Sequence, residues 1–173
     1  MACPHSHLPE PVTMRRLALA LLLAAAPWAA IAAEEGKAYG DWRVACEPRP
    51  EAKGQACHLF QNQMVQGGQR LLLVRIGKLG PKAEPMIVAE VPLGLDLTLG
   101  AAAKIDPGPQ VNLRPLTCTP DGCRMAAGLD DTALKAMTLA KGMVIGIVPF
   151  GRTEVLQMPV SVNGLAEGLG AIK

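Results

Sequence analysis

The 173-residue sequence contains few aromatic side chains: two Trp, one Tyr and two Phe. Proteins that bind bases or sugar rings commonly stack them on aromatic side chains, so this chain is poorly equipped for such ligands. The formal net charge is also small, at +2. A near-neutral protein has little electrostatic attraction for nucleic acid or for anionic membranes. The composition therefore argues against both as partners.

Catalytic side chains are scarce as well. Nucleophilic catalysis requires a nucleophile beside a base, and after the first 32 residues the chain has one serine, Ser161, and one histidine, His58. Ser161 lies in a strand-like segment rather than at a sharp turn, and we expect it to face solvent. We interpret His58 as a surface or capping residue. The glycines are isolated turn glycines and form no phosphate-binding motif. The sequence indicates no catalytic residues and no cofactor.

The N-terminal residues have the pattern of a secretory leader. Two arginines after Met14 form a basic region, residues 17–26 form an apolar stretch, and residues 30–32 resemble a cleavage site. The apolar stretch is shorter than a transmembrane helix requires. We expect residues 1–32 to be an N-terminal extension and cleaved signal peptide, with Met14 as the true start.

We expect residues 33–173 to form a single β-rich domain. No stretch after the leader is long and apolar enough to span a bilayer, so the sequence predicts no transmembrane segment after cleavage. A cleaved leader implies that the protein is exported and is therefore periplasmic, secreted or associated with the outer surface of the cell.

Four cysteines follow the leader, at Cys46, Cys57, Cys118 and Cys123. In an exported protein an even number of cysteines indicates disulfides, and four cysteines allow three pairings. We favour Cys46–Cys57 and Cys118–Cys123, because each pair is close in sequence and brackets turn-forming residues. Zinc sites space their cysteines more closely, and redox sites use a Cys-x-x-Cys motif that this chain lacks. We therefore expect neither a metal site nor a redox site.

Alternating apolar residues and frequent Gly and Pro turns predict an all-β fold. The most regular alternation places leucines at every second position from Leu93 to Leu99. We interpret residues 91–106 as a central, hairpin-like unit with one buried face. The whole pattern favours an antiparallel β-sandwich of about nine short strands, with a partly closed β-barrel as the alternative.

Three further segments carry secondary-structure signals. Residues 70–76 and 143–150 are continuous apolar runs, and we expect both to be among the most buried strands. The first is typical of a strand that is covered on both faces, and we interpret the second as a central strand. Asp130 has the position of a helix N-cap and predicts one short helix near residues 130–140. Residues 164–173 have helical spacing, but three glycines make a helix there uncertain.

Two sequence blocks resemble a known protein family. Residues 39–46 read YGDWRVAC, and residues 92–106 follow the pattern PLG-x-x-L-x-x-G-x-x-x-x-ID. With the Cys118–Cys123 pair and the closing Gly-Leu tail, they resemble the invasion-associated locus B family of exported Gram-negative envelope proteins. The likeness covers nearly the whole chain after the leader. It implies a periplasmic or surface-associated β-rich domain, with a link to host-cell invasion for some members, and it supplies no catalytic residues.

Three classes of function remain open. The favoured one is a non-enzymatic envelope protein that binds another envelope or host protein through loops or strand edges. The second is a module that holds a small apolar or lipid-like ligand inside a β-barrel. The third is a hydrolase, which the lack of a nucleophile beside a base disfavours.

Overall fold

The computed structural model describes residues 33–48, 55–80 and 82–172 of the chain. The predicted leader, with Met14, lies outside the described residues. Within the described ranges ten strands form one antiparallel sheet with two short helices. The strands are β1 (Ala38–Tyr39), β2 (Trp42–Pro48), β3 (Gln55–Met64), β4 (Arg70–Leu79), β5 (Glu84–Val91), β6 (Ala101–Asp106), β7 (Gln110–Thr119), β8 (Gly122–Gly128), β9 (Gly142–Ile147) and β10 (Leu156–Val160). The helices are α1 (Asp131–Thr138) and α2 (Leu165–Ala171).

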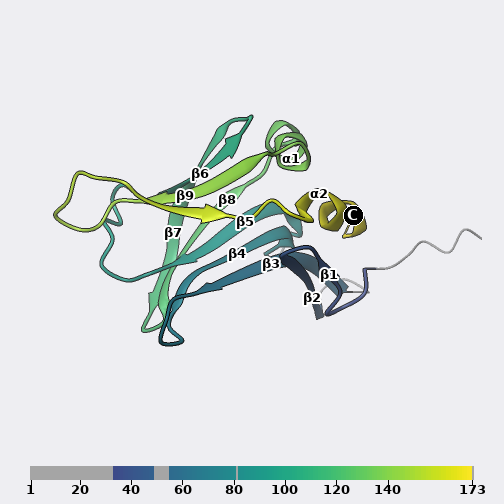
Figure 1. Cartoon of the computed structure of the whole chain (residues 1–173), viewed down its shortest axis with the longest axis horizontal. Helices are drawn as coiled ribbons and strands as arrows, with labels where there is room; N and C mark the ends of the chain where they lie inside the picture. The colour runs from purple at the N-terminus through teal and green to yellow at the C-terminus, as the bar shows by residue number, and fades with distance from the viewer. Residues whose placement is uncertain (1–32, 49–54, 81, 173) are drawn as a thin grey trace, which may run out of the picture. The chain divides into compact units, whose positions relative to one another are not determined.

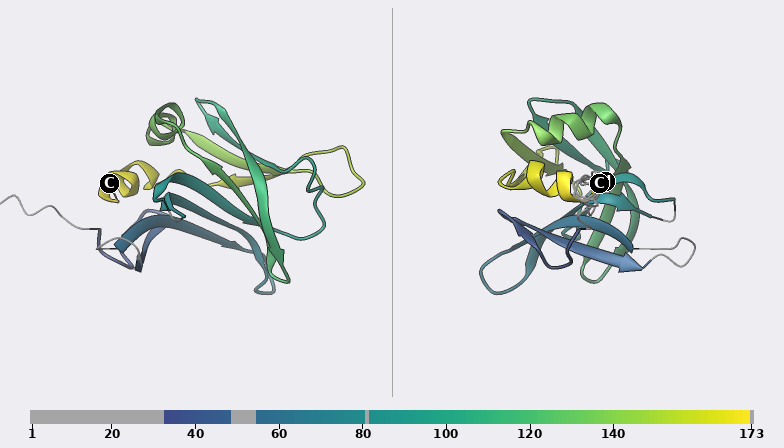
Figure 2. Two further views of the ribbon diagram at one scale, coloured as in Figure 1. Left: turned by 180° about the vertical axis from the view of Figure 1, so that it is seen from behind. Right: turned by 90° about the vertical axis from the view of Figure 1, so that its right-hand side faces the viewer.

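The sheet has the strand order β1-β2-β3-β4-β5-β8-β7-β6-β9-β10. Strand β7 connects its two parts, because residues 110–113 pair with β6 and residues 114–119 pair with β8. The sheet curls about this strand, so that β6, β9 and β10 face β3, β4 and β5 (Figures 1 and 2). The prediction of an all-β fold with a short helix is confirmed. The single curled sheet is the partly closed barrel that the sequence offered as an alternative to the sandwich.

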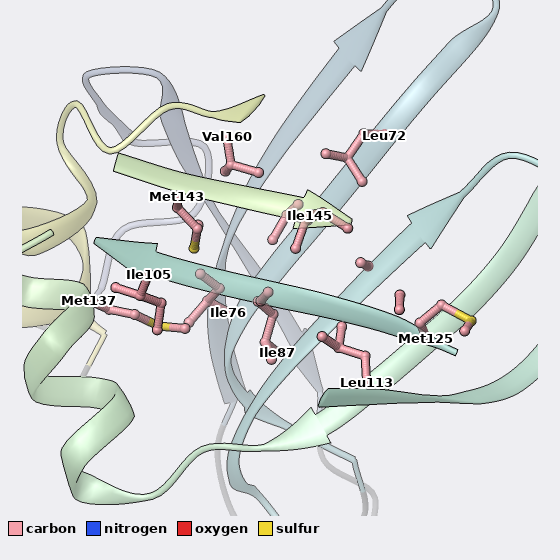
Figure 3. Packing of buried hydrophobic residues seen from close by; sticks show 14 of the residues in the cluster. Leu72, Ile76, Ile87, Ile105, Leu113, Met125, Met137, Met143, Ile145 and Val160 are labelled. Carbon is pink, nitrogen blue, oxygen red and sulfur yellow. The ribbon is translucent and has the colours of Figure 1, made fainter. Parts of the chain in front are cut away.

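Apolar side chains fill the space inside the curled sheet. β4 and β5 contribute Ile76 and Ile87, and β6 and β9 contribute Ile105 and Ile145, all of them buried. These isoleucines point into the same interior, where Met137 of α1 lies beside Ile105 (Figure 3). Burying a side chain of this size contributes about 1.5–3 kcal/mol each. The interior that the second class of function would use for an apolar ligand is therefore occupied by the protein's own side chains.

The alternating leucines of residues 93–99 form a loop, so the prediction of a strand over this segment is wrong. Gly94 and Gly100 have φ angles of 85° and 70°, which interrupt an extended backbone. Leu95 alone among the four leucines is buried, and the other three are at least 44% exposed. The second half of the predicted unit is correct, because β6 follows directly after Gly100.

The two continuous apolar runs differ in how they are covered. Residues 70–76 lie in β4 and include buried side chains on both faces, so that prediction is confirmed. In the run 143–150, β9 ends at Ile147 and Phe150 is 78% exposed. Only the inner face of β9 is buried, because alternate residues are buried and half-buried along the strand. The second run is therefore a strand with one covered face, and it lies next to the edge strand β10 rather than at the centre of the sheet.

Both helices have a local physical cause. Asp130 caps α1, because its Oδ1 accepts a hydrogen bond from the backbone N–H of Ala133 at 2.7 Å, as the sequence predicted. The segment that the glycines left uncertain forms α2. In α2, a Cβ on Gly168 would lie 2.7 Å from Cδ1 of Leu59, a fully buried residue of β3. The close approach of helix and sheet thus requires glycine at this position.

Both predicted disulfides are present. Cys46–Cys57 joins directly paired residues of β2 and β3, and Cys118–Cys123 joins directly paired residues of β7 and β8. In the loop-entropy description, bridges across loops of this length contribute roughly 2–3 kcal/mol each. The two bonds fix two neighbouring strand pairs of the sheet.

Side chains, rather than a backbone ladder, connect β10 to the opposite wall. Gln63 Nε2 donates to the carbonyl of Pro159 at 2.7 Å, and Trp42 Nε1 donates to the carbonyl of Ser161 at 2.9 Å. The Gln61 amide both donates to the carbonyl of Ser161 at 3.3 Å and accepts from its N–H at 3.0 Å. These bonds satisfy the backbone at the edge of β10 and hold the barrel partly closed.

The two glycines of α2 provide a direct test of its packing. Gly→Ala normally stabilises a helix interior by about 0.5–1 kcal/mol. We expect Gly170→Ala to follow this rule, because a Cβ there meets no atom within 4 Å. Gly168→Ala is expected to destabilise the protein by about 1–2 kcal/mol, because the added methyl group overlaps with Leu59. Urea denaturation of both variants measures the difference, and equal stabilities would contradict the packing described here.

Candidate functional site

Four connections lie at the end of the sheet away from the two helices. They are the turn 65–69 between β3 and β4, the loop 92–100 between β5 and β6, the turn 120–121 between β7 and β8, and the loop 148–155 between β9 and β10. Figure 1 shows them on the side opposite α1 and α2. A surface depression lies between the first three of these connections. We call these four connections together the loop end.

The loop end carries most of the large apolar side chains that the described residues leave exposed. Ten such side chains are exposed, and nine of them lie in the loop end or within four residues of it. The exception, Leu139, follows α1. Clusters of exposed apolar side chains on a protein surface mark interaction sites. The nine are Met64, Val65, Leu93, Leu97, Leu99, Leu116, Phe150, Val155 and Leu156.

Backbone hydrogen bonds hold the two long loops together. The N–H of Asp96 donates to the carbonyl of Val148 at 2.8 Å, and the N–H of Phe150 donates to the carbonyl of Gly94 at 2.8 Å. Leu95, between these bonds, forms an isolated β-bridge with the second loop and turns its side chain into the core. The two loops therefore form one structured surface.

Asp96 stabilises the first loop from within. Its carboxylate accepts hydrogen bonds from the backbone N–H of Thr98 at 2.9 Å and from the Thr98 hydroxyl at 2.6 Å. These two bonds lower the pKa of Asp96 below its usual value. A side chain that closes a turn in this way has a structural role, which explains an aspartate among leucines.

A buried carboxylate ties together the strands that support the loop end. Glu90 lies near the end of β5 and is 7% exposed. Its oxygens accept from Arg70 at 2.8 Å, from Arg75 at 3.0 Å and from Arg124 at 2.7 Å. Burial acts to raise the pKa of Glu90, but the hydrogen bonds from Arg75 and Arg124 outweigh it and hold the pKa below its usual value. The cluster joins β4, β5 and β8 where they approach the loop end.

Sequence reasoning did not identify the Glu90 cluster, because its members come from three strands and form no linear motif. The only available signal was the presence of Arg70 and Arg75 in the apolar run of β4. A charged residue in a strand that is covered on both faces needs a partner of opposite charge.

The structure does not bring Ser161 and His58 together. The Ser161 hydroxyl donates to Asp41 Oδ2 at 2.6 Å, and its backbone binds Gln61 of β3. His58 and Gln61 are three residues apart in one strand, so their side chains point to opposite faces. His58 is buried rather than at the surface, contrary to the prediction, and burial lowers its pKa. It lies directly opposite Gly77 of β4, which leaves room for its side chain.

In the part of the chain that the structure describes, no group of three or more His, Cys, Asp or Glu side chains is placed to hold a metal ion. Among the described residues, neither helix has the length and apolar character needed to cross a membrane.

The family model described as "Invasion associated locus B (IalB) protein" matches residues 42–173. The chain belongs to the invasion-associated locus B family. The resemblance predicted from the two sequence blocks is thus confirmed.

Two curated relatives and one solved structure are similar to this family member. The invasion protein B homolog of Brucella abortus (strain 2308) is 28% identical over 137 residues, which are 78% of this chain and 77% of the relative. The homolog of Brucella abortus biovar 1 (strain 9-941) matches to the same extent. The crystal structure of invasion associated protein b from Bartonella henselae has a TM-score of 0.66 at 17% identity, covering 79% of this chain and 92% of that chain. At that identity the likeness shows a shared fold.

The two blocks that carry the family resemblance have different places in this structure. In the first block, Trp42 is fully buried, and Asp41 accepts the hydroxyl hydrogen of Ser161. Gly40 lies so close to Asn163 that a Cβ would be 2.5 Å from its carbonyl oxygen. This block therefore fixes the start of β2 against the segment after β10. The second block forms the loop 92–100 and β6, and so builds part of the loop end.

The Glu90 cluster predicts a pH-dependent stability. A carboxylate whose pKa is lowered by folding stabilises the protein fully above its unfolded pKa, and this contribution is lost as the pH falls through its folded pKa. We expect Glu90→Gln to lower the free energy of unfolding by about 1–3 kcal/mol at neutral pH, because three arginines lose their charged partner.

The difference between wild type and Glu90→Gln is expected to shrink below about pH 4, where the unfolded carboxylate becomes protonated. Urea titrations across this range measure it. Glu84→Gln, at an exposed position of the same strand, is the matched control and should change little at any pH. A Glu90→Gln effect that is constant with pH would contradict the assignment.

Proposed function

We propose that this member of the invasion-associated locus B family is an exported, non-enzymatic envelope protein that binds another protein through its loop end. The observation that carries the proposal is that nine exposed apolar side chains lie in or near the loop end, five of them on the two long loops that are hydrogen-bonded to each other. The leader-like N-terminus and the two disulfides support export, because disulfides form and persist in oxidising compartments.

The charge of the loop end favours a protein over an anionic lipid surface. The four connections contain three acidic residues, Asp96, Asp121 and Glu154, and one basic residue, Arg152. Anionic membranes attract surfaces that are rich in Lys and Arg, and membrane-interface segments commonly add Trp or Tyr. The connections contain no Trp or Tyr. Leucine and phenylalanine on a structured backbone instead suit a complementary apolar surface on a partner protein.

The rigidity of the two long loops lowers the free-energy cost of binding. Ordering a flexible loop on association costs free energy, and a surface that is already ordered avoids much of that cost. The inter-loop hydrogen bonds and the Asp96 turn order these loops in the free protein. Burying one exposed leucine or phenylalanine contributes up to about 1.5–3 kcal/mol. A few of these side chains are therefore enough to supply most of the affinity of a transient complex.

The proposal that the protein is not an enzyme rests on where the structure places the residues that could act as a nucleophile and a base. The two residues that come nearest to a hydrolase pair are Ser161 and His58. The Ser161 backbone is bound to Gln61 on one face of β3, whereas the His58 side chain points to the other face. The Ser161 hydroxyl is bound to a carboxylate at the edge of the barrel, where it helps to hold β10.

Photo-crosslinking in living cells tests the proposal. A photoreactive amino acid at position 150 in the loop end is expected to crosslink a defined envelope or host protein, whereas one at position 139 after α1 is not. Leu99→Ser should reduce the position-150 crosslink at least about fivefold by removing buried apolar area. Leu139→Ser is the matched control, because both leucines are 63% exposed.

Equal crosslinking from positions 139 and 150, crosslinks to lipid or to a second copy of this chain only, or insensitivity to Leu99→Ser would contradict the proposal. The uncrosslinked protein recovered from the same cells also tests export. Its intact mass should correspond to a chain that begins near Ala33, and a product that retains Arg15 and Arg16 would contradict cleavage of the leader.

A further inference from the structure

A groove of about 710 Å³ crosses the outer face of β7, β6, β9 and β10. Its floor is made of small or apolar residues that face outward: Ala102 of β6 and Val144 and Gly146 of β9. Leu99 and Val155 border it where it meets the loop end. It lies outside the barrel and is separate from the filled core.

The floor of the groove is unusual for the outer face of an antiparallel sheet. Outward positions of such sheets are normally polar, because they face water. In β4, the outward apolar residue Leu73 is covered and only 6% exposed. The outward residues Val144 and Gly146 of β9 are half-buried. A Cβ on Gly146 would lie 3.0 Å from Cγ1 of Val155. The apolar run of β9 is therefore typical of a strand with two covered faces, while its outer face lies open in the groove.

The opposite end of the groove is polar and offers a positive charge. Lys104 lies on the outer face of β6, two residues beyond Ala102, and is exposed. Every salt bridge among the described residues involves Glu90, so Lys104 has no such partner there. Beside it, Gln110 donates a hydrogen bond to Asn112 Oδ1 at 2.9 Å, which leaves the Asn112 amide hydrogens able to donate to a ligand.

Asp106, also on the groove wall, limits the charge of a ligand. It follows Lys104 by two residues on the same face of β6. A single negative charge placed at Lys104 gains attraction, whereas a second negative charge nearer to Asp106 is repelled. A monoanionic group fits this arrangement better than a dianionic one.

We propose that this groove binds an amphiphile with one alkyl chain and one anionic group. The chain lies over Ala102 and Gly146 toward Leu99, and the anion is held by Lys104. A volume of about 710 Å³ lies within the range of small-molecule sites. A free fatty acid and a single-chain phospholipid share this chemistry. The inference goes beyond the proposed protein binding and does not depend on it.

The floor argues for an alkyl chain over an extended peptide. A peptide lying on this face would have its backbone N–H and C=O groups against Ala102, Val144 and Gly146, none of which has a polar side chain. Leaving such groups unpaired is costly. An alkyl chain has no polar groups to satisfy and gains from the same apolar contact.

NMR titration of the isotope-labelled protein tests the proposal. The probes are dodecanoate and lauroyl-lysophosphatidylglycerol, with methyl dodecanoate as the uncharged counterpart, each below its micelle-forming concentration. We expect saturable shifts of the Ala102, Val144 and Gly146 amides with either anionic probe, and the tighter of the two identifies the source of the ligand.

Variants separate the roles of charge and shape. Lys104→Glu should weaken binding of the anionic probes at least about tenfold, because it replaces attraction by repulsion, and should leave methyl dodecanoate unaffected. Lys82→Glu, the same charge change in the exposed turn before β5, is the matched control and should alter nothing. Ala102→Phe should fill the groove and abolish binding of all three probes. If Ala102→Phe does not fold, Gly146→Val tests the same point, because Gly146 has no positive φ angle.

The proposal is overturned if no saturable shift occurs at Ala102 and Gly146, if shifts are confined to the loop end, or if Lys104→Glu behaves like Lys82→Glu. Shifts caused by an acetylated Val-Ala-Val-Ala amide but not by dodecanoate would also overturn it, in favour of a peptide. None of these results bears on the crosslinking from position 150, so the two proposals fail independently.

Discussion

The hydrogen bonds between the loops 92–100 and 148–155 are the constraint on which the character of this molecule depends. Leucines on a flexible loop would fold back onto the nearest apolar surface, since exposure to water is unfavourable. Here the N–H groups of Asp96 and Phe150 are bound to the opposite loop, and Leu95 anchors the pair in the core. The neighbouring side chains are thereby held outward. Exposed apolar area is thus a property of the backbone arrangement as much as of the residue types.

The rest of the barrel explains why such an arrangement is confined to one end. At the other end, α2 packs so closely on β3 that only glycine fits at Gly168, and α1 places Met137 in the core. Along the open edge of β10, amide side chains of Gln61 and Gln63 bind backbone groups that a closed barrel would pair in a ladder. Beneath the loop end, Glu90 joins three strands through arginines. Apolar packing at the helix end, and side chains that satisfy polar groups along β10 and around Glu90, thus stabilise the rest of the barrel and leave the loops free to present an apolar surface.

How far the fold could be predicted depended on whether a feature is local. The Asp130 cap, the local disulfides and the all-β class follow from neighbouring residues, and all were predicted. The strand predicted from alternating leucines over residues 93–99 is absent. The residue types alternate there, but the positive φ angles of the glycines do not allow an extended backbone. The coverage of β9 and the Glu90 cluster could not be predicted for another reason. Which face is covered, and which arginines meet, is set by strand order and register, which one sequence does not reveal.

Amide hydrogen exchange tests the central claim most directly, because it reports whether the two long loops are ordered in the free protein. The amides of Asp96 and Phe150 donate across the loops, whereas that of Leu97 has no acceptor in the described part of the chain. The account predicts that the Asp96 and Phe150 amides exchange at least about tenfold more slowly than the Leu97 amide, after correction for intrinsic rates. Equal and fast exchange at all three positions would show that the loops move independently, and would contradict a preformed binding surface at this end of the molecule.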